Sequence, residues 1–302
     1  MIQTLRIGTR GSPLALAQAR MVATALRDMH GWGPERIEIV PITTTGDMIR
    51  DRPLAEMGGK ALWTRELDRA LAEGLTDVSV HSMKDVETMR PPALEIAAML
   101  PRADVRDRLI GAESLAALPE GARIGTSSPR RRAQLLARRP DLVIVPLRGN
   151  VDTRLRKIQL GEADATLLAA AGLERLGHAE GVVLDDLLPA PAQGAIGVEV
   201  RAGDRRIRAL IHDIDHRPTH VCVQAERRFL ERLSGSCHSA VAALAQMERG
   251  RIRLRAEILA PDGSEVQAGE IVYTVAKEDR PAELAAELLG KASIGLRARF
   301  AG

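Results

Sequence analysis

The amino-acid sequence predicts an α/β protein in which two lobes of one plan precede a small α+β domain. In the first two-thirds of the chain, segments typical of strands alternate with segments typical of helices, as in a largely parallel sheet covered by helices. RIGTRGSP at 6–13 and GLTDVSV at 74–80 are echoed in the same order by RIGTSSP at 123–129 and GEADATL at 161–167. Two echoes in one order indicate duplicated lobes. Beyond residue 217 the alternation stops.

The first lobe is expected to alternate strand and helix from its start. Ser12 and Pro13 are the N-cap and first residue that a helix prefers. Leu62, Leu67 and Leu71 fall on one side of a second helix. The expected elements are strand 5–9, helix 12–29, strand 36–44, helix 63–74 and strand 77–82.

Breaks in the pattern mark the ends of the second lobe. Pro101 and the charged segment 103–108 form the expected boundary at its start, and LLPAPAQGA at 187–195 interrupts the pattern at its end. The remaining chain reads as a small α+β domain. Its expected elements are helix 218–233, strands 251–261 and 269–276, and helix 281–293.

The composition is that of an ordinary globular protein. Of the 302 residues, 45% are apolar and 27% are charged, but only 2% are aromatic, so Leu, Ile, Val and Ala must build the cores. The N-terminal segment turns polar too early for a secretory signal. No apolar run approaches the roughly 18–20 residues that cross a bilayer. We therefore expect a cytoplasmic protein.

Two cysteines are too few for a disulfide framework in such a protein. Cys222 recurs at helical spacing with Phe229 and Leu233, so we expect a thiol buried in a core. Cys237 stands in the small-residue segment LSGSCHSA, where its sulfur would be reachable and His238 would favour the thiolate. From the residues alone, an idle surface thiol remains the alternative for Cys237.

Three segments could offer backbone N–H groups and cations to an anion. Residues 9–12 and 126–128 each open a helix, whose N-terminus favours negative charge. The third segment, LRGNVDTRLRK, surrounds Gly149-Asn150. The arginines of these segments, besides Arg10, are Arg130, Arg131, Arg148, Arg154 and Arg156. Each segment alone could be a helix cap beside solvated arginines. Together, on two lobes that leave a cleft, they predict a site for an acidic small molecule.

VHSMKDV at 80–86 is the densest group of candidate functional residues. A strand end delivers Ser82, Lys84 and Asp85 into a turn. An exposed Lys-Asp pair would contribute little to stability. A carboxylate in a cationic cleft, by contrast, stays ionised and can stabilise a developing cation or move a proton.

A metal site and nucleic-acid binding are weaker hypotheses. His212, His216 and His220 have the spacing of one helix face, but Pro218 would break that helix and no carboxylate or thiol completes a ligand set. SPRRRAQLLARRP is basic, yet the aromatic side chains that stack on single strands are missing and the net charge is only +3. The sequence has no phosphate loop of the GxxxxGK[ST] type.

Taken together, eight motifs make the chain resemble the porphobilinogen deaminase family. The match runs from about residue 5 to residue 240 and continues more loosely to the C-terminus. The motifs, in order, are TRGSPLALAQA, GGKALWTREL, VHSMKDV, GTSSPRR, LRGNVDTRL, AAAGLERLG, PAQGA and LSGSCH.

The resemblance implies three domains and a covalent cofactor. Residues 1–98 with 195–214, and residues 101–190, would form two lobes like those of type II periplasmic binding proteins, on either side of the active-site cleft. Residues 217–302 would form the C-terminal α+β domain. The family's dipyrromethane primer is held in thioether linkage by a loop cysteine that aligns with Cys237. No metal is implied, and a monomer is expected.

The activity implied is a transferase step of porphyrin and heme biosynthesis. Four porphobilinogen molecules are condensed head to tail with loss of ammonia, and hydrolysis releases the linear tetrapyrrole, which could be handed to the next pathway enzyme. Asp85 matches the catalytic aspartate. The other residues implied are Ser82, Lys84, Thr126, Ser128, Arg130 and Arg131 for the primer, Arg10, Ser12, Gln18, Arg148, Arg154 and Arg175 for the substrate, and Lys60 and Trp63 for the lid.

The chain departs from the family pattern in the lid and in the cysteine loop. Glu56 stands where a lysine is common, and Ala61 and Ser236 stand where glycines are usual. Ser239-Ala240 replaces a usual Val-Pro. None of these changes removes a group that the chemistry needs. The alternative from another class is a non-catalytic carboxylate-binding protein on the same fold, which would need neither Asp85 nor a modified cysteine.

Overall fold

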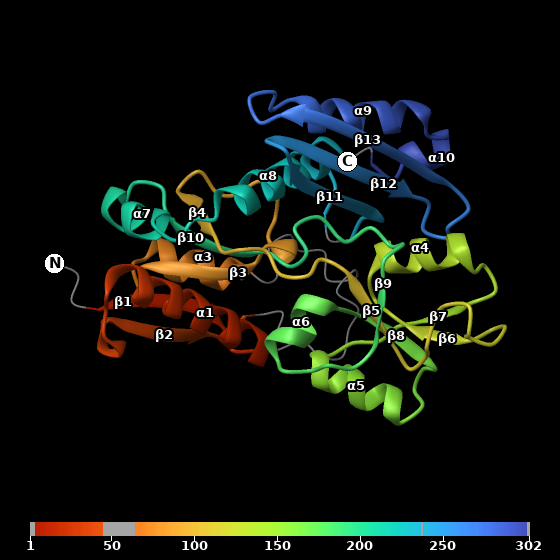
Figure 1. Cartoon of the computed structure of the whole chain (residues 1–302), viewed down its shortest axis with the longest axis horizontal. Coiled ribbons are helices and arrows are strands. Elements are labelled where there is room, and N and C mark those ends of the chain that lie inside the picture. The colour runs from red at the N-terminus through yellow and green to blue at the C-terminus, as the bar shows by residue number, and fades with distance from the viewer. Residues whose placement is uncertain (1–3, 45–63, 237, 301–302) are drawn as a thin grey trace. The chain divides into compact units, whose positions relative to one another are not determined.

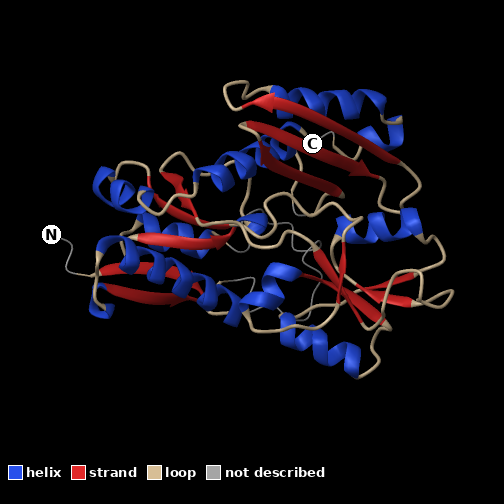
Figure 2. Cartoon of the chain, viewed as in Figure 1, coloured by secondary structure: helices blue, strands red, loops and turns tan. Residues whose placement is uncertain are grey.

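The computed structural model describes residues 4–44, 64–236 and 238–300. The chain divides into two compact units, one formed by residues 1–103 and 195–220 and the other by residues 104–194 and 221–302. Among the described residues, the first unit holds a five-stranded sheet, and the second holds another five-stranded sheet and a three-stranded sheet (Figures 1 and 2).

The first unit has the strand order β2-β1-β3-β10-β4. β1 is parallel to β2 and β3, whereas β10 is antiparallel to both β3 and β4. The elements are β1 Leu5–Arg10, α1 Pro13–His30, η1 Pro34–Arg36, β2 Ile37–Ile42, α3 Arg65–Ala72, β3 Val78–Ser82, η3 Met83–Asp85, β4 Leu94–Met99, β10 Ile196–Arg201 and α7 Arg205–His212. The five elements expected between residues 5 and 82 are all present, within two residues of their expected bounds.

Capping and apolar spacing explain α1. The Ser12 hydroxyl accepts the N–H of Ala15 at 3.3 Å, and Pro13 needs no such partner, so the helix begins there. Gly31 ends it with a φ of 64°, which suits glycine. Val22 and Leu26 face the sheet and are fully buried in its core. The helix is therefore held against the sheet with its N-terminus at the carboxyl end of β1.

The second five-stranded sheet repeats the plan of the first. Its order is β7-β6-β8-β5-β9, with β6 parallel to β7 and β8, and β5 antiparallel to β8 and β9. β5 therefore occupies the place that β10 has in the first sheet. The elements are β5 Asp107–Ile110, β6 Arg123–Gly125, α4 Pro129–Arg138, β7 Val143–Val145, α5 Val151–Gln159, β8 Ala165–Ala169, α6 Ala170–Arg175 and β9 Val182–Leu184. The prediction of two α/β lobes of one plan is confirmed.

The C-terminal part is a three-stranded antiparallel sheet with helices on its apolar face. Ile252, Leu254 and Ile258 alternate along the middle strand and pack in one core with Phe229 and Leu288. The elements are α8 Arg217–Arg232, β11 Val241–Glu248, β12 Arg251–Leu259, β13 Val266–Thr274, α9 Arg280–Lys291 and α10 Ile294–Arg297. The predicted α+β character is confirmed. The three-domain boundaries stay a prediction, because the second lobe and this sheet fall in one unit.

Two further expectations concern cysteine and histidine. Cys222 is 5% exposed and lies in the core of the C-terminal part, as predicted. His212 ends α7 and His216 precedes α8, so the three spaced histidines do not share one helix. Among the described residues, no helix combines the length and the apolar character needed to cross a membrane.

The turn between β12 and β13 packs on α4, and Gly263 makes this contact possible. Gly263 has a φ of 74°, and a Cβ atom there would collide with the backbone of α4, including the carbonyl oxygen of Ala133 at 2.9 Å. Gly250, in the hairpin between β11 and β12, has a similar φ of 78° but nothing within 4 Å. The two glycines have similar backbone conformations and differ in how closely other atoms approach the place of a Cβ atom.

Gly263→Ala should therefore lower the melting temperature more than Gly250→Ala does. Both variants incur the cost of a side chain at positive φ, roughly 1–2 kcal/mol. Only Gly263→Ala must also separate the turn from α4. Thermal unfolding followed by circular dichroism measures the difference. Equal melting temperatures for the two variants would show that the contact with α4 does not matter for stability.

Candidate active site

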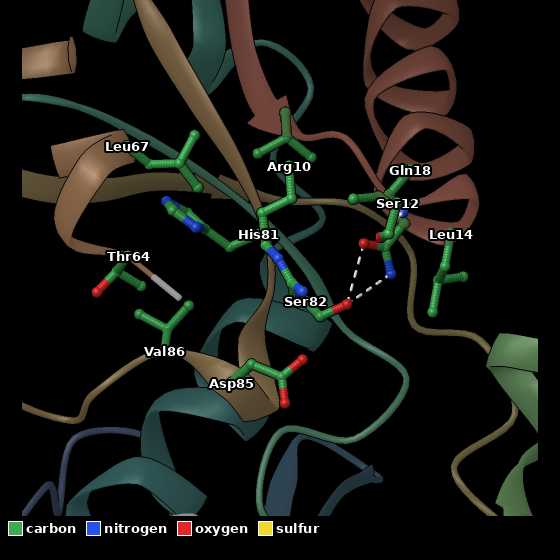
Figure 3. A pocket seen from close by; sticks show the side chains of 12 residues that line it. Arg10, Ser12, Leu14, Gln18, Thr64, Leu67, His81, Ser82, Asp85 and Val86 are labelled. Carbon is green, nitrogen blue, oxygen red and sulfur yellow. Dashed lines mark hydrogen bonds between the residues drawn. The ribbon is translucent and has the colours of Figure 1, made fainter. Parts of the chain in front are cut away.

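A pocket in the first unit gathers residues from the carboxyl ends of β1 and β3 (Figure 3). In parallel sheets these ends meet at one edge, which is where ligands bind. Polar side chains from three segments line the pocket. They are Arg10, Ser12, Gln18, Thr64, His81, Ser82 and Asp85. Five of the residues predicted for the substrate, the primer or catalysis thus lie around one cavity.

Gln18 and Ser82 hold each other in place across this pocket. Gln18 Nε2 donates to Ser82 Oγ at 2.8 Å, and Ser82 Oγ donates back to Gln18 Oε1 at 3.0 Å (Figure 3). Gln18 is buried on α1, and Ser82 is the last residue of β3. The pair therefore fixes the helix against the strand end at the wall of the pocket.

Asp85 enters the pocket from a single turn of 3-10 helix that follows β3. Met83, the first residue of that turn, is buried and anchors it, and its carbonyl oxygen accepts the N–H of Val86 at 3.3 Å. Asp85 itself is partly exposed. In the described part of the chain, the structure records no hydrogen bond or ion pair to its carboxylate. Asp85 is also the one acidic side chain among the described residues that line the pocket, so it supplies the negative charge there.

A buried carboxylate, Glu199 of β10, lies beside this pocket. His81 Nε2 lies 3.0 Å from its Oε2, and Arg90 donates to both oxygens, from Nε at 2.7 Å and from Nη2 at 2.9 Å. Burial by itself raises the pKa of Glu199, but the hydrogen bonds and charges of His81 and Arg90 outweigh burial and lower it to about 2. Glu199 is therefore a fixed anion at neutral pH.

In the second unit, two of the predicted anion segments are helix caps. Ser128 caps α4 and accepts the N–H of Arg131 at 3.4 Å, while its own N–H donates to Thr126 Oγ1 at 3.2 Å. Asn150 caps α5 and accepts the N–H of Thr153 at 2.8 Å. Each segment thus presents the N-terminal end of a helix of eight residues or more.

Arg130 and Arg131 are buried on Asp107, the first residue of β5. The side chains of the three residues are 3%, 7% and 0% exposed. Arg131 donates to Asp107 through Nε at 3.2 Å and Nη2 at 2.8 Å, and Arg130 donates through Nη2 at 2.7 Å. Burial opposes ionisation of Asp107, but the two guanidinium groups outweigh it and hold its pKa far below the usual range.

Both arginines are thus paired with a carboxylate of the chain itself, a contact that the sequence did not reveal. Asp107 could not be recognised as their partner from the sequence, since nothing local links it to residues 23 and 24 positions further along. Within the part of the chain that the structure describes, Arg130 Nε is buried and has no hydrogen-bond partner.

Arg148, Arg154 and Arg175 occupy two other places in the second unit. Arg154 Nε donates to the carbonyl oxygen of Gly149 at 2.9 Å, which holds it over the turn that also carries Arg148. Arg175, at the end of α6, donates to the carbonyl oxygen of Gly194 at 2.7 Å, but its buried Nε has no hydrogen-bond partner among the described residues. Burial lowers the pKa of Arg175 to about 10, opposed only by the charge of Glu174. A buried cation with so little compensation is suited to an anionic ligand.

The structure thus describes the predicted residues in two sets. Arg10, Ser12, Gln18, Ser82 and Asp85 line the pocket of the first unit, with Lys84 in the same turn. The residues of the second unit surround the starts of α4 and α5 and the end of α6. Cys237, Lys60 and Trp63, together with Glu56 and Ala61, lie outside the described residues. Among the described residues, no cluster of His, Cys, Asp or Glu could hold a metal ion.

Comparisons with known proteins point to one family over nearly the whole chain. The family model for the porphobilinogen deaminase dipyromethane cofactor binding domain matches residues 5–209, and the model for the porphobilinogen deaminase C-terminal domain matches residues 220–292. A porphobilinogen deaminase of Sphingopyxis alaskensis is 56% identical over 98% of this chain and 96% of its own length. One of Paracoccus denitrificans is 52% identical over 95% of this chain and 94% of its own length.

Solved structures give a weaker match. An ancestral cationic amino acid solute binding protein aligns with 70% of this chain and 88% of its own, at 16% identity and a TM-score of 0.45.

Asp107→Asn should destabilise the protein by about 3–5 kcal/mol at pH 7, because two buried cations lose their anion. A carboxyl group whose pKa is depressed in the folded state stabilises the fold above its unfolded pKa of about 3.9, and that contribution is lost as the pH falls toward the folded value. The difference in melting temperature between wild type and variant should therefore narrow below about pH 4.

Asp141→Asn is the matched control, since Asp141 pairs with Arg139 on the surface of the same lobe. Its effect on the melting temperature should be small. A melting temperature of Asp107→Asn equal to that of the control would contradict a central role for the buried carboxylate.

Proposed function

The chain belongs to the porphobilinogen deaminase family, and from this membership we propose that it is a transferase that condenses four porphobilinogen molecules head to tail on a dipyrromethane primer. Each condensation releases ammonia, and hydrolysis finally frees the linear tetrapyrrole hydroxymethylbilane. The observation that carries the proposal is the agreement of both family models and of relatives at 49–56% identity over most of the chain. The comparisons do not favour a non-catalytic carboxylate-binding protein.

Arginine chemistry supports a primer and substrate rich in carboxylates. Each porphobilinogen unit carries an acetate and a propionate, so the growing chain accumulates negative charge. Charge-assisted, often bidentate arginine contacts suit such groups. The Nε atoms of Arg130 and Arg175, buried and unpartnered among the described residues, fit this need, as does the weak compensation of the Arg175 charge.

The residues that we propose for the primer are Ser82, Lys84, Thr126, Ser128, Arg130 and Arg131, with attachment through Cys237. When bound, the primer supplies the free pyrrole carbon to which the first substrate is joined. Asp107 keeps both arginines charged and oriented without using all their donors. A guanidinium group has five N–H donors, so the same side chain can bind Asp107 and a carboxylate of the ligand.

For the incoming substrate we propose Arg10, Ser12, Gln18, Arg148 and Arg154, with Arg175 serving elongation and Lys60 and Trp63 belonging to a lid. Gln18 contributes by fixing the Ser82 hydroxyl. The N-terminal end of α1 favours an anion, and Arg10 lies at the strand end just before it. These contacts would orient the substrate through its acidic side chains.

Asp85 is the proposed catalytic residue. Loss of ammonia from the aminomethyl carbon of porphobilinogen leaves an electron-poor pyrrole with positive charge. A fixed carboxylate near the pyrrole N–H stabilises that charge, and it can later accept the proton that leaves the newly joined ring carbon. As the one acidic group among the described residues lining the pocket, Asp85 is suited to both tasks.

We also propose that the enzyme acts in the cytoplasm and passes its linear product to the enzyme that follows it. A reducing compartment keeps cysteine thiols free, and a free thiol at position 237 is what thioether attachment requires.

The intact mass of protein purified from cells should exceed the sequence mass by two pyrrole units. Cys237→Ser should lose this excess, because the hydroxyl does not replace the thiolate as a nucleophile. Cys222→Ala, which changes the buried core cysteine, should keep it. Mass spectrometry under denaturing conditions separates these outcomes. An unmodified thiol at position 237 in active protein would refute the proposed attachment.

Asp85→Asn should fold normally but lose most of its turnover, since the amide cannot stabilise the cationic intermediate or accept a proton. The measurements are hydroxymethylbilane formation and the melting temperature. Asp28→Asn, on the exposed face of α1, is the control and should turn over normally. If Asp85→Asn retained near-normal turnover, the catalytic assignment would be wrong.

A further inference from the structure

The turn that carries Asp85 is bound at both of its ends to one buried carboxylate. His81, the residue before the last of β3, lies 3.0 Å from Glu199 Oε2. Arg90, five residues beyond Asp85, makes a bidentate hydrogen-bonded contact with both oxygens of Glu199. The segment between His81 and Arg90 is therefore closed into a loop whose two ends share a single anchor.

The anchoring residue, Glu199, lies on an interior strand of the sheet. Glu199 is fully buried on β10, which pairs with β3 on one side and with β4 on the other. The pairing of β10 with β4 shifts register between Val198 and Glu199. Such irregularities re-aim a side chain and are common beside active sites. The N–H of Met83 donates to the carbonyl oxygen of Ala195 at 3.1 Å, so the turn is also attached to the start of β10.

Further contacts of Arg90 restrain the same loop. Arg90 Nη1 donates to Glu87 Oε2 at 2.9 Å, and Nη2 donates to Asp68 of α3. Thr64 Oγ1 donates to Glu87 Oε2 at 2.9 Å. The loop residue Glu87 is thus held by the same guanidinium that binds Glu199. The described contacts of this network thus restrain the loop at several points.

A purely structural role explains this network poorly. Charges buried in a pair stabilise a fold no better than apolar residues of the same volume, whereas they fix one arrangement. Here three carboxylates bind one guanidinium group at the end of the segment that presents Asp85. The arrangement is what the orientation of a catalytic group requires.

We propose that Glu199 is a positioning residue for Asp85: it binds His81 and Arg90 and thereby keeps the intervening turn in the conformation that presents the Asp85 carboxylate to the pocket. This rests on the catalytic role proposed above for Asp85. Glu199 does not line the pocket itself and acts through the two ends of the loop. Displacement of a catalytic group by about 1 Å can reduce a rate about 100-fold.

The test is a double-mutant cycle of Glu199→Gln and Asp85→Asn. Glu199→Gln keeps the shape of the side chain but removes the charge and one of the acceptors for Arg90. We expect kcat to fall about 10- to 100-fold, with KM changed much less, because the substrate-binding arginines remain in place. In the Asp85→Asn background the same change should have little further effect, since the group that it positions is already absent.

Three readouts that do not depend on turnover accompany the cycle. Intact mass should show that Glu199→Gln still carries the primer. Hydrogen exchange should become faster in the peptide covering residues 83–90 than in the rest of the first unit. The melting temperature measures the global loss of stability. Asp77→Asn is the matched control: it breaks the Asp77–Arg6 pair, beside the opposite end of β3, and should lower stability without lowering kcat.

The outcomes separate this inference from the proposed function. Near-normal turnover of Asp85→Asn alone would refute the catalytic role and the positioning role with it. Poor turnover of Asp85→Asn, combined with equal effects of Glu199→Gln in both backgrounds, would refute the positioning role alone. If Glu199→Gln does not fold, Arg90→Lys provides the second cycle. It retains the charge but loses the two-bond contact, and additive effects with Asp85→Asn would again overturn the proposal.

Discussion

A buried arginine needs a buried anion, and both lobes are built around that requirement. In the first, Glu199 compensates Arg90; in the second, Asp107 compensates Arg130 and Arg131. Removing one partner of such a pair leaves an unpaired charge in a medium of low dielectric constant, which costs several kcal/mol. The contacts are therefore obligatory rather than optional, and they fix the segments that carry the candidate site residues.

The repeated topology explains why the two carboxylates occur where they do. β10 and β5 hold the same place in their sheets, each antiparallel and each between the third strand and the edge strand. Glu199 stands opposite Ser79 of β3, and Asp107 stands opposite Ala169 of β8. Both carboxylates are fully buried at these places, so each must bind a cation. In each lobe that cation lies in the segment that carries candidate site residues.

Local patterns in the sequence were enough to predict the elements between residues 5 and 82 and most of those beyond residue 217, and contacts between distant strands explain what they could not predict. The Ser12-Pro13 cap, the alternation in β12 and the helical spacing around Cys222 depend only on neighbours within a few residues, and each is confirmed. The pairing of Arg130 and Arg131 with Asp107 could not be predicted, because Asp107 is distant in the sequence. Glu199 in IGVEVR could not be recognised from local patterns, since its partners His81 and Arg90 lie more than 100 residues away in the sequence.

Arg175 is the contrasting case, a largely buried cation without a bound carboxylate among the described residues. Its guanidinium is largely buried like those of Arg90 and Arg131, but the described residues offer it a carbonyl oxygen and the nearby charge of Glu174, and no carboxylate bound to it. Burial lowers its pKa to about 10, which means that the fold alone disfavours the charged form relative to water. A fold selected only for stability would have paired or exposed this residue. An acid bound to this guanidinium group would supply the missing anion and would offset the cost of burying the cation.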